Sequence, residues 1–391
     1  MSAHWWELAP LVLVAAWAFL LVAHGRYWAT DVRLPPTPEP AHWPSVAVIV
    51  PARNEAEMLV STLPGLVAQD YPGQAGVVLV DDASSDDTAA TARRIGTSGR
   101  LPLVVVGGEA RPEGWAGKPW ALQQGLVFAT GDPSWAPEWL LLTDADIAHP
   151  PESLARLVAA AVGGQRDMVS LMARLEVVTG WERLLIPAFV YFFAQLYPFR
   201  RVGRPGRTAA AAGGCILVRT SALAAAGGTE SIRGAVIDDV ALARQLKRSG
   251  ASIWLGLADD VRSVRPYAGL GELWSMVARS AFTQLRCSAI LLVGTLAGLV
   301  ALYLGPVIAL VAGVASSAGG AGADGWLIAE GAISWAIMAA TYLPMVRYYR
   351  LRRLWALALP AAATLYGAMT ADSARRHWLG GGVEWKGRRY A

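Results

Sequence analysis

Three long stretches near the C-terminal end of the sequence carry no charge apart from one glutamate. They are Ser288 to Ala315, Trp326 to Val346, which contains Glu330, and Leu354 to Ala371. About 20 consecutive apolar residues are enough for a helix to span the hydrocarbon layer of a bilayer. The stretches therefore predict three or four membrane passes. With 54% hydrophobic and only 16% charged residues, the chain cannot be disordered, collagenous or a small disulfide scaffold.

The number of passes depends on the charges between them. Arginines follow the second stretch and recur in the tail, so the positive-inside rule places both regions in the cytoplasm. This requires an even number of crossings after Arg286. Either Ser288 to Ala315 forms a hairpin at Gly305-Pro306, or Leu354 to Ala371 dips into the membrane without crossing it.

The N-terminal end predicts a further membrane segment. Leu8 to Ala23 is uncharged, and we expect residues 1–25 to form a transmembrane anchor. A cleaved signal peptide is the alternative, but Met1 to Glu7 lacks the basic residues of such peptides. Arg26 and Arg33 follow the segment, which places the middle of the chain in the cytoplasm.

The middle of the chain has the charge balance of a soluble domain. Arg26 to Arg286 contains 25 basic and 25 acidic residues, while the whole chain carries +4. This balance argues against nucleic acid as a partner. We expect a Pro-rich linker at 26–44, a cytoplasmic domain at 45–286, transmembrane segments at 287–372 and a basic cytoplasmic tail at 373–391. The two cysteines form no zinc or disulfide pattern.

Short apolar runs alternate with helical patterns through this domain, as in an α/β fold. The predicted strands are Val46 to Val50, Val77 to Val80, Leu103 to Val106, Trp139 to Thr143, Met168 to Met172, Cys215 to Val218 and Ile253 to Leu257. The first four are nearly continuous in hydrophobicity, as expected of parallel strands covered on both faces. Ligands of such sheets bind at the carboxyl ends of the strands.

Acidic residues follow the first two strands. The first runs into Pro51 to Glu55, and the second into Asp81 to Thr88. Ser85 or Asp86 is expected to cap a helix, but capping does not require Asp81 and Asp82 as well. Two adjacent carboxylates need a partner with donors, and a nucleoside offers ribose hydroxyls and a base N–H.

The fourth strand ends in two carboxylates at positions i and i+2, Asp144 and Asp146. On an extended backbone both can reach one cation, and Mg²⁺ or Mn²⁺ suits such oxygen ligands. His149 lies close by, but the two prolines after it favour a turn residue over a ligand.

Together these motifs resemble a family 2 glycosyltransferase of GT-A fold over about residues 45 to 286. The resemblance rests on Val-Pro-Ala-Arg-Asn-Glu at 50–55, Val-Asp-Asp-Ala-Ser-Ser-Asp-Asp-Thr at 80–88, Gly117-Lys118 with Ala121-Leu122, and Asp144-Ala145-Asp146. More narrowly, residues 114–120, 143–147 and 281–286 are similar to those of bacterial hopanoid-associated glycosyltransferases.

The resemblance implies roles for individual residues. Glu55 and Asp82 would contact the uridine, Asp144 would face the ribose or the metal, and Asp146 would hold the metal. Asp238-Asp239 matches the family's acidic pair, whose second member is the base. The nucleotide-sugar site is expected to comprise Pro51, Arg53, Asn54, Glu55, Asp81, Asp82, Lys118, Asp144, Gln284 and Arg286.

Several of these residues have a second interpretation. Lys118 either donates to the diphosphate or is a solvated residue at a helix start. Asp239 either takes the proton of the acceptor hydroxyl or, with Asp238, favours the dipole of a helix beginning there.

Two further segments are expected near the membrane. On a helix at 270–286, Arg279 and Arg286 would share one face and contact either diphosphate or lipid headgroups. Gln284-Leu285-Arg286 only partly matches the Gln-x-x-Arg-Trp signature of processive synthases. The aromatic segment 181–199 is expected to form an interfacial helix, with a buried core helix as the alternative.

These features predict a cytoplasm-facing, metal-dependent, inverting glycosyltransferase of the bacterial inner membrane. Its donor would be a nucleotide sugar, expected to be UDP-linked, and its acceptor a lipid. The resemblance implies a hopanoid, and a polyprenyl phosphate, a ceramide-like lipid or diacylglycerol is the alternative. A catalytically idle membrane scaffold and a processive synthase are the other hypotheses.

Overall fold

The chain folds into two units in the computed structural model, which describes residues 9–132, 136–318, 325–380, 383–385 and 388–390. The α/β unit comprises Asp31–Glu176, Phe199–Pro266 and Glu384–Ala391. The helical unit comprises Met1–Thr30, Val177–Pro198 and Tyr267–Val383.

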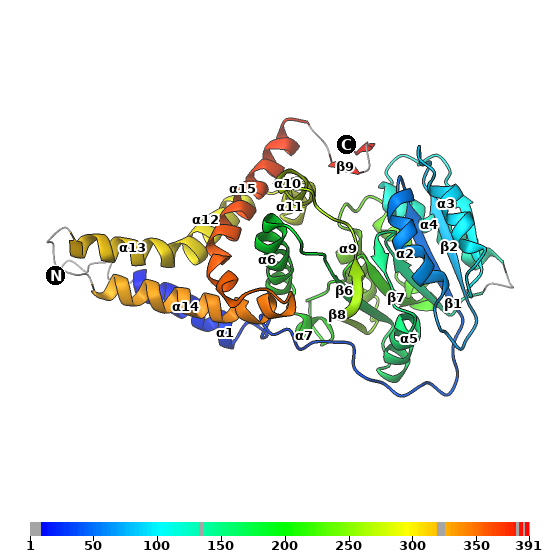
Figure 1. The fold of residues 1–391 in the computed structure, drawn as a ribbon, viewed down its shortest axis with the longest axis horizontal. Helices are drawn as coiled ribbons and strands as arrows, with labels where there is room; N and C mark the ends of the chain where they lie inside the picture. The colour runs from blue at the N-terminus through cyan, green and yellow to red at the C-terminus, as the bar shows by residue number, and fades with distance from the viewer. Residues whose placement is uncertain (1–8, 133–135, 319–324, 381–382, 386–387, 391) are drawn as a thin grey trace. The chain divides into compact units, whose positions relative to one another are not determined.

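The α/β unit has a mixed eight-stranded sheet with the strand order β3-β2-β1-β4-β7-β6-β8-β5 (Figure 1). The strands are β1 (Val46–Ala52), β2 (Ala75–Asp81), β3 (Leu103–Gly107), β4 (Trp139–Thr143), β5 (Ile147–Ala148), β6 (Met168–Arg174), β7 (Cys215–Arg219) and β8 (Ile253–Ser263). The first four are parallel, and β7 is antiparallel to both of its neighbours. The mixed sheet of a GT-A fold predicted from the sequence is confirmed.

Helices cover both faces of this sheet. They are α2 (Ala56–Val67), α3 (Thr88–Gly96), α4 (Gly117–Gly131), α5 (Ser153–Gly163), α9 (Asp238–Arg248) and the short α7 (Phe199–Val202) and α8 (Thr220–Ala225). Alternate residues of β1 pack in one core with the apolar residues of α2 and α5. On the other face α4 lies so close that a Cβ at Gly125 would be 2.5 Å from Ile49. Burial on both faces explains the uninterrupted apolar runs of these strands.

Residues of the predicted Pro-rich linker, 26–44, contact strands and helices of the α/β unit. Arg33 forms a bridge with Leu257 and an ion pair with Asp259 at 2.5 Å. Near the other end of the segment, the Tyr71 hydroxyl donates to the Pro44 carbonyl at 2.5 Å.

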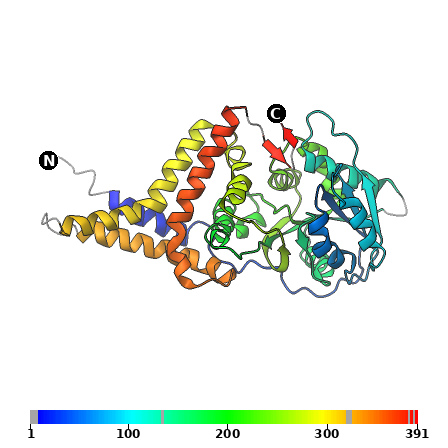
Figure 2. The ribbon, with the colours of Figure 1, turned by 45° about the horizontal axis from the view of Figure 1, so that its top comes forward.

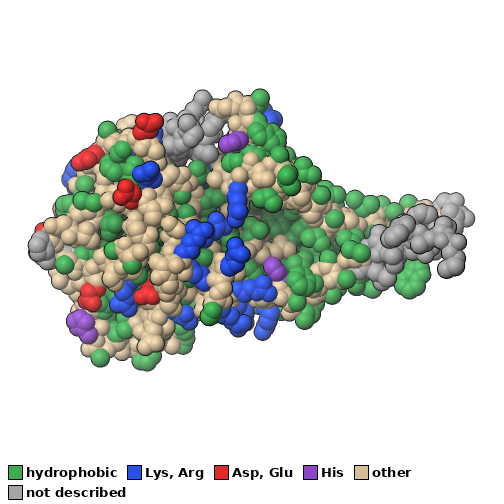
Figure 3. Space-filling view, turned by 180° about the vertical axis from the view of Figure 1, so that it is seen from behind, with side chains coloured by type: hydrophobic (Ala, Val, Ile, Leu, Met, Phe, Trp, Pro, Cys, Tyr) green, Lys and Arg blue, Asp and Glu red, His purple; other side chains and the backbone are tan. Residues whose placement is uncertain are grey.

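The helical unit contains the apolar stretches. Its helices are α1 (Ala9–Val22), α6 (Gly180–Leu196), α10 (Leu270–Ala278), α11 (Ala281–Gln284), α12 (Ala289–Leu299), α13 (Gly305–Ala318), α14 (Gly325–Tyr348) and α15 (Leu359–Trp378). Among the described residues, three segments are long and apolar enough to cross a membrane, at Ala289–Ser316, Gly325–Tyr348 and Arg353–Trp378. α12 runs alongside α15 (Figure 2). Hydrophobic side chains cover much of the face of this unit that Figure 3 shows.

The hairpin considered for Ser288 to Ala315 does not form. Instead α12 continues into α13 through a π-helix at Val300–Leu304. Pro306 has no N–H with which to bond the carbonyl of Leu302, four residues earlier, and such positions are relieved by a local π-bulge. The indole N–H of Trp17, on α1, donates to this carbonyl at 2.9 Å. The proline therefore distorts the helix without reversing the chain.

Two other expectations about helices need correction. The predicted helix at 270–286 is broken into α10 and α11, and Arg286 follows α11 with a φ of 55°. Arg279 and Arg286 therefore do not share the face of one helix. Most of the segment 181–199 forms a helix, α6, which ends at Leu196, but much of this helix is buried in the helical unit. Its Glu182 accepts from the backbone N–H groups of Thr179, at 2.7 Å, and Tyr267, at 2.9 Å.

Candidate active site

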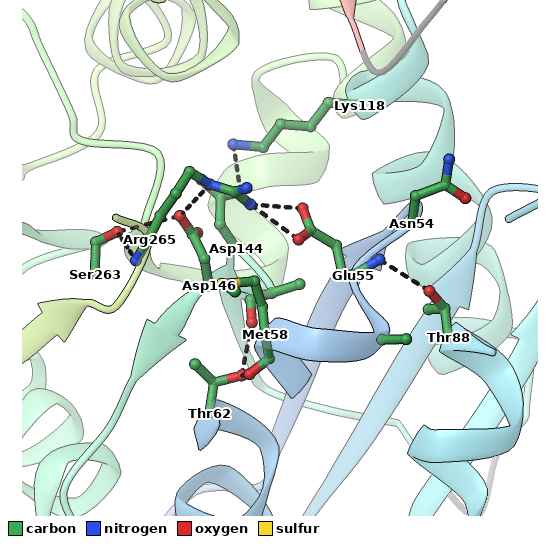
Figure 4. A network of polar contacts seen from close by, with 12 residues as sticks. Asn54, Glu55, Met58, Thr62, Thr88, Lys118, Asp144, Asp146, Ser263 and Arg265 are labelled. Carbon is green, nitrogen blue, oxygen red and sulfur yellow. Dashed lines mark hydrogen bonds and ion pairs between the residues drawn. The ribbon is translucent and has the colours of Figure 1, made fainter. Parts of the chain in front are cut away.

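Loops from separate strands meet at one edge of the α/β sheet. β1 and β4 are parallel neighbours, so the loops that follow them leave the sheet at the same edge. They carry Glu55 and the pair Asp144 and Asp146, and Arg265 follows the end of β8. Figure 4 shows these side chains directed toward one another.

Arg265 joins two of the predicted residues. Its Nε donates to Asp146 Oδ2 at 2.9 Å, and one terminal nitrogen donates to both oxygens of Glu55, at 2.7 and 2.9 Å (Figure 4). Burial alone would lower the pKa of the guanidinium, but the charges of Asp146 and Glu55 raise it above its usual value. Arg265 was not among the predicted site residues. No signal in the sequence indicated it, because the predicted strand ended at Leu257, eight residues before Arg265, whereas β8 continues to Ser263.

Lys118, the second residue of α4, joins two others. Its Nζ lies 2.6 Å from Asp144 and 3.6 Å from Asp238, and its side chain is only 18% exposed. Burial would lower the pKa of this amine, but Asp144 and Asp238 raise it. Lys118 is therefore not the solvated helix-start residue considered as an alternative.

Asp238 and Asp239 are the first two residues of α9, as the dipole interpretation requires. Asp239 also accepts a hydrogen bond from outside its helix, because the N–H of Gly213 donates to its Oδ2 at 2.9 Å. Burial first, and then the charge of Asp238, raise the pKa of Asp239 to about 7, although Lys118 opposes the shift. A helix-start role alone does not account for these features.

Gly213 lies close to both Lys118 and Asp239. A Cβ at this position would be 2.9 Å from Lys118 Nζ and 3.4 Å from Asp239 Oδ2, so a larger residue would require the lysine nitrogen to move. A small cavity is lined by Pro51, Lys118, Asp144, Gly213 and Asp238, among others. A second cavity, lined by residues such as Ser45 and Ala75 at the starts of β1 and β2, contains none of the predicted residues.

The loops after β1 and β2 are joined by hydrogen bonds. Arg53 donates to the carbonyl oxygen of Asp82 at 2.5 Å, and Asn54 Oδ1 accepts from the N–H of Ser85 at 2.8 Å. Asn54 has a φ of 51°, a conformation that asparagine tolerates better than most residues. Asp82 is buried, and Asp81 Oδ1 accepts from the N–H of Ser84 at 3.2 Å.

The expected capping residue has a wider role. Asp87, rather than Ser85 or Asp86, occupies the N-cap position of α3, without a side-chain cap bond. Asp86 instead accepts from the first N–H of each of two helices, Thr88 of α3 and Ala56 of α2, both at 3.1 Å. It therefore joins the two loops.

Gln284 and Arg286 belong to the helical unit, outside the α/β unit that contains the other predicted residues. Gln284 donates to the hydroxyl of Tyr197. His149 is buried, with its ring nitrogens 2.8 Å from the Thr143 hydroxyl and 3.1 Å from that of Ser153. Burial lowers the pKa of His149 to about 4, so it is a neutral structural residue.

The donor set fits a hard divalent cation that is shared with a substrate. Within the described ranges, no group of three or more His, Cys, Asp and Glu side chains is placed to hold a metal ion. Mg²⁺ sites commonly use one or two carboxylates and complete their coordination with substrate phosphates and water. Asp144 and Asp146 supply oxygen ligands of this kind.

The model of the family described as "Glycosyl transferase family 2" matches residues 47–226. This part of the chain is similar to that family. The mannosyltransferase PcManGT from Pyrobaculum calidifontis, solved in complex with GDP-Man and Mn²⁺, is similar in structure. The match has a TM-score of 0.56 at 22% identity and covers 95% of this chain and 98% of that one. It supports the GT-A fold of the glycosyltransferase domain.

Two curated proteins match shorter segments. An N-acetylglucosaminyltransferase of Mesorhizobium japonicum is 34% identical over 89 residues, 21% of this chain. An undecaprenyl-phosphate 4-deoxy-4-formamido-L-arabinose transferase of Sodalis glossinidius is 32% identical over 121 residues, 30% of this chain. The chain spans only 21% and 33% of the lengths of these relatives.

Proposed function

We propose that the chain is a membrane-bound, inverting glycosyltransferase that moves a sugar from a UDP-linked donor to a lipid acceptor. The observation that carries the proposal is the cluster of carboxylates from separate elements, bridged by Lys118 and Arg265, in a glycosyltransferase family 2 domain. Candidate membrane helices in the same chain support a lipid acceptor and a membrane location, for which we propose the bacterial inner membrane. Arg26 and Arg33, which follow the N-terminal apolar segment, favour a domain that faces the cytoplasm.

The donor would bind along the loops after β1, β2 and β4. Glu55 and Asp82 would contact the nucleoside, and Asp144 and Asp146 would hold Mg²⁺ or Mn²⁺. A cation bound there supplies Lewis-acid stabilisation of the diphosphate leaving group. Lys118 adds a fixed positive charge beside Asp144.

The acceptor hydroxyl is a weak nucleophile at neutral pH and requires a base. Asp239 would accept its proton during attack, a contribution on the order of 10² to 10⁴ in rate. The hydrogen bond from Gly213 keeps Oδ2 of this carboxylate in place. Direct attack opposite the leaving group inverts the anomeric carbon.

A hopanoid is our first candidate for the acceptor, on the basis of the sequence resemblance. A polyprenyl phosphate, a ceramide-like lipid or diacylglycerol is the alternative. The relative from Sodalis glossinidius is named for undecaprenyl phosphate, which favours including that lipid in every test.

The test is sugar transfer by the full chain in nanodiscs, with UDP-sugars and GDP-mannose as donors and a panel of these lipids as acceptors. Mass spectrometry identifies the product. We expect Asp146→Asn and Asp239→Asn to lower turnover at least ~100-fold. Asp260→Asn is the matched control, because this acid pairs with Arg156 on the surface. Normal turnover in both site variants would refute the assignments, and inactivity of the wild type with every lipid would favour an idle scaffold.

A further inference from the structure

The guanidinium of Arg265 forms ion pairs with two carboxylates that have different predicted roles. Arg265 contacts Asp146, a predicted metal ligand, and Glu55, a predicted nucleoside contact, at 2.7 to 2.9 Å. Both carboxylates are well buried, with side chains 15% and 8% exposed, whereas the side chain of Arg265 is 31% exposed. Two carboxylates this close to each other in a buried site require a positive partner, and Arg265 is that partner here.

The guanidinium contacts one of the two carboxylate oxygens of Asp146. Oδ2 of Asp146 accepts from Arg265 Nε at 2.9 Å and from the Ser263 hydroxyl at 3.1 Å (Figure 4). A divalent cation binds a carboxylate oxygen at about 2.0–2.2 Å, with its own charge directed at the same lone pairs. Because a guanidinium does not lose its proton in proteins, a cation on Oδ2 would be repelled by Arg265 until the arginine side chain moves.

We propose that Arg265 is an internal counter-cation that competes with the divalent metal for Asp146. It is a positioning residue: it keeps Asp146 and Glu55 in place before the donor arrives and is displaced from Asp146 when the metal binds. This inference rests on the proposed function, because that function makes Asp146 a metal ligand. The side chain of Arg265 is 31% exposed, so it is not fully enclosed by the protein.

The competition should affect the affinities for both the metal and the nucleotide. The metal alone has to break a charge-assisted hydrogen bond, so its affinity in the absence of nucleotide is reduced. The same guanidinium occupies both oxygens of Glu55. When the metal displaces Arg265, the hydrogen bonds from Arg265 to Glu55 therefore also weaken. Glu55, the proposed nucleoside contact, then becomes available to the nucleotide, so metal and nucleotide should favour each other's binding.

The test is a Mn²⁺ titration of the full chain in detergent without nucleotide, with free Mn²⁺ measured by electron paramagnetic resonance. We expect Arg265→Gln to bind Mn²⁺ roughly 10- to 100-fold more tightly than the wild type, as loss of a charge-assisted hydrogen bond implies. Arg265→Lys keeps the charge but loses the fork geometry and should lie between them. The matched control is Arg262→Gln, which removes the same charge from an exposed position on β8 and should change the affinity less than ~3-fold.

Asp146→Asn distinguishes a failure of the proposed metal site from a failure of the proposed competition by Arg265. If it leaves Mn²⁺ binding unchanged, Asp146 is not a metal ligand, and the metal site of the proposed function fails. If Asp146→Asn abolishes binding while Arg265→Gln binds no more tightly than the wild type, the inference alone is overturned. Thermal unfolding guards against a folding defect: Arg265→Gln should melt at a lower temperature without metal, and Mn²⁺ should raise its Tm by more than that of the wild type.

Discussion

The ionisation of Asp239 should set the lower pH limit of the proposed reaction. Burial and the neighbouring charge of Asp238 raise the pKa of Asp239 to about 7. A base works only when ionised, so kcat/KM should fall as the pH drops below 7, with about one tenth of the carboxylate ionised at pH 6. The wild-type enzyme should therefore show an acidic limb with a midpoint near 7.

Asp238→Asn tests the cause of this shift. It removes the like charge that disfavours ionisation of Asp239, so the pKa should fall by ~1 unit. At pH 6 the ionised fraction then rises from about one tenth to about one half. Relative to its own plateau, kcat/KM at pH 6 should increase about 5-fold, even if the plateau falls because Lys118 loses its contact with Asp238 at 3.6 Å.

The assay is initial rate against pH from 5.5 to 9, at constant ionic strength, saturating Mn²⁺ and donor well below KM. Glu230→Gln is the control, because this exposed acid lies in the same unit and its removal should leave the limb in place. An acidic limb that stays near 7 in Asp238→Asn, or moves to higher pH, would refute the reasoning. The same holds for a wild type without any limb between pH 6 and 8.

Two further substitutions test the packing described above. Gly213→Ala places a methyl group 2.9 Å from Lys118 Nζ and beside Asp239, so kcat/KM should fall roughly 10- to 100-fold with little change in Tm, and an active variant would show that the lysine can shift freely. Trp17→Phe removes the donor to the Leu302 carbonyl and should destabilise the helical unit by about 1 kcal/mol, measured by thermal unfolding in detergent. An unchanged Tm would mean that the π-helix satisfies this carbonyl by other means.

The strands of the α/β unit were predictable because their burial is complete. Every residue of β1 is buried, so its sequence is apolar without interruption and flanked by polar loops. All seven predicted runs are strands in the structure. β5 was not predicted, since two residues are too few to show a periodic pattern. The end of β8 was predicted six residues too early, because the strand continues with exposed Asp259, Asp260 and Arg262.

Helix boundaries in the helical unit were less predictable. A continuous apolar sequence does not show where a helix changes its hydrogen-bonding pattern, so the π-helix at Val300–Leu304 was missed. The break between α10 and α11 was missed for a similar reason, because no proline or glycine interrupts residues 272–286. Each place is also bonded by a residue distant in sequence: the Trp17 indole donates to the Leu302 carbonyl, and the Ser373 hydroxyl accepts from the N–H of Phe282 in α11.

The ion pairs of the site were also not predictable from the sequence. The sequence indicates acids by their position after strands, and Asp144 and Asp146 were expected to face one cation. In the structure they bind two different side chains: Asp144 pairs with Lys118 and Asp146 with Arg265. The two cations lie 147 positions apart in the sequence, so no local motif could pair them with their acids.

These two ion-pair bridges should affect how the donor binds to the proposed enzyme. Lys118 joins the loop after β4 to the start of α9, and Arg265 joins the same loop to the loop after β1. Each cation thus bridges two elements whose carboxylates would otherwise repel one another across a buried site. Because both bridges end on Asp144-Ala145-Asp146, a ligand that binds this segment must compete with one or both of them. Donor binding should therefore alter contacts to α9, which carries the proposed base, as well as contacts within the nucleotide loops.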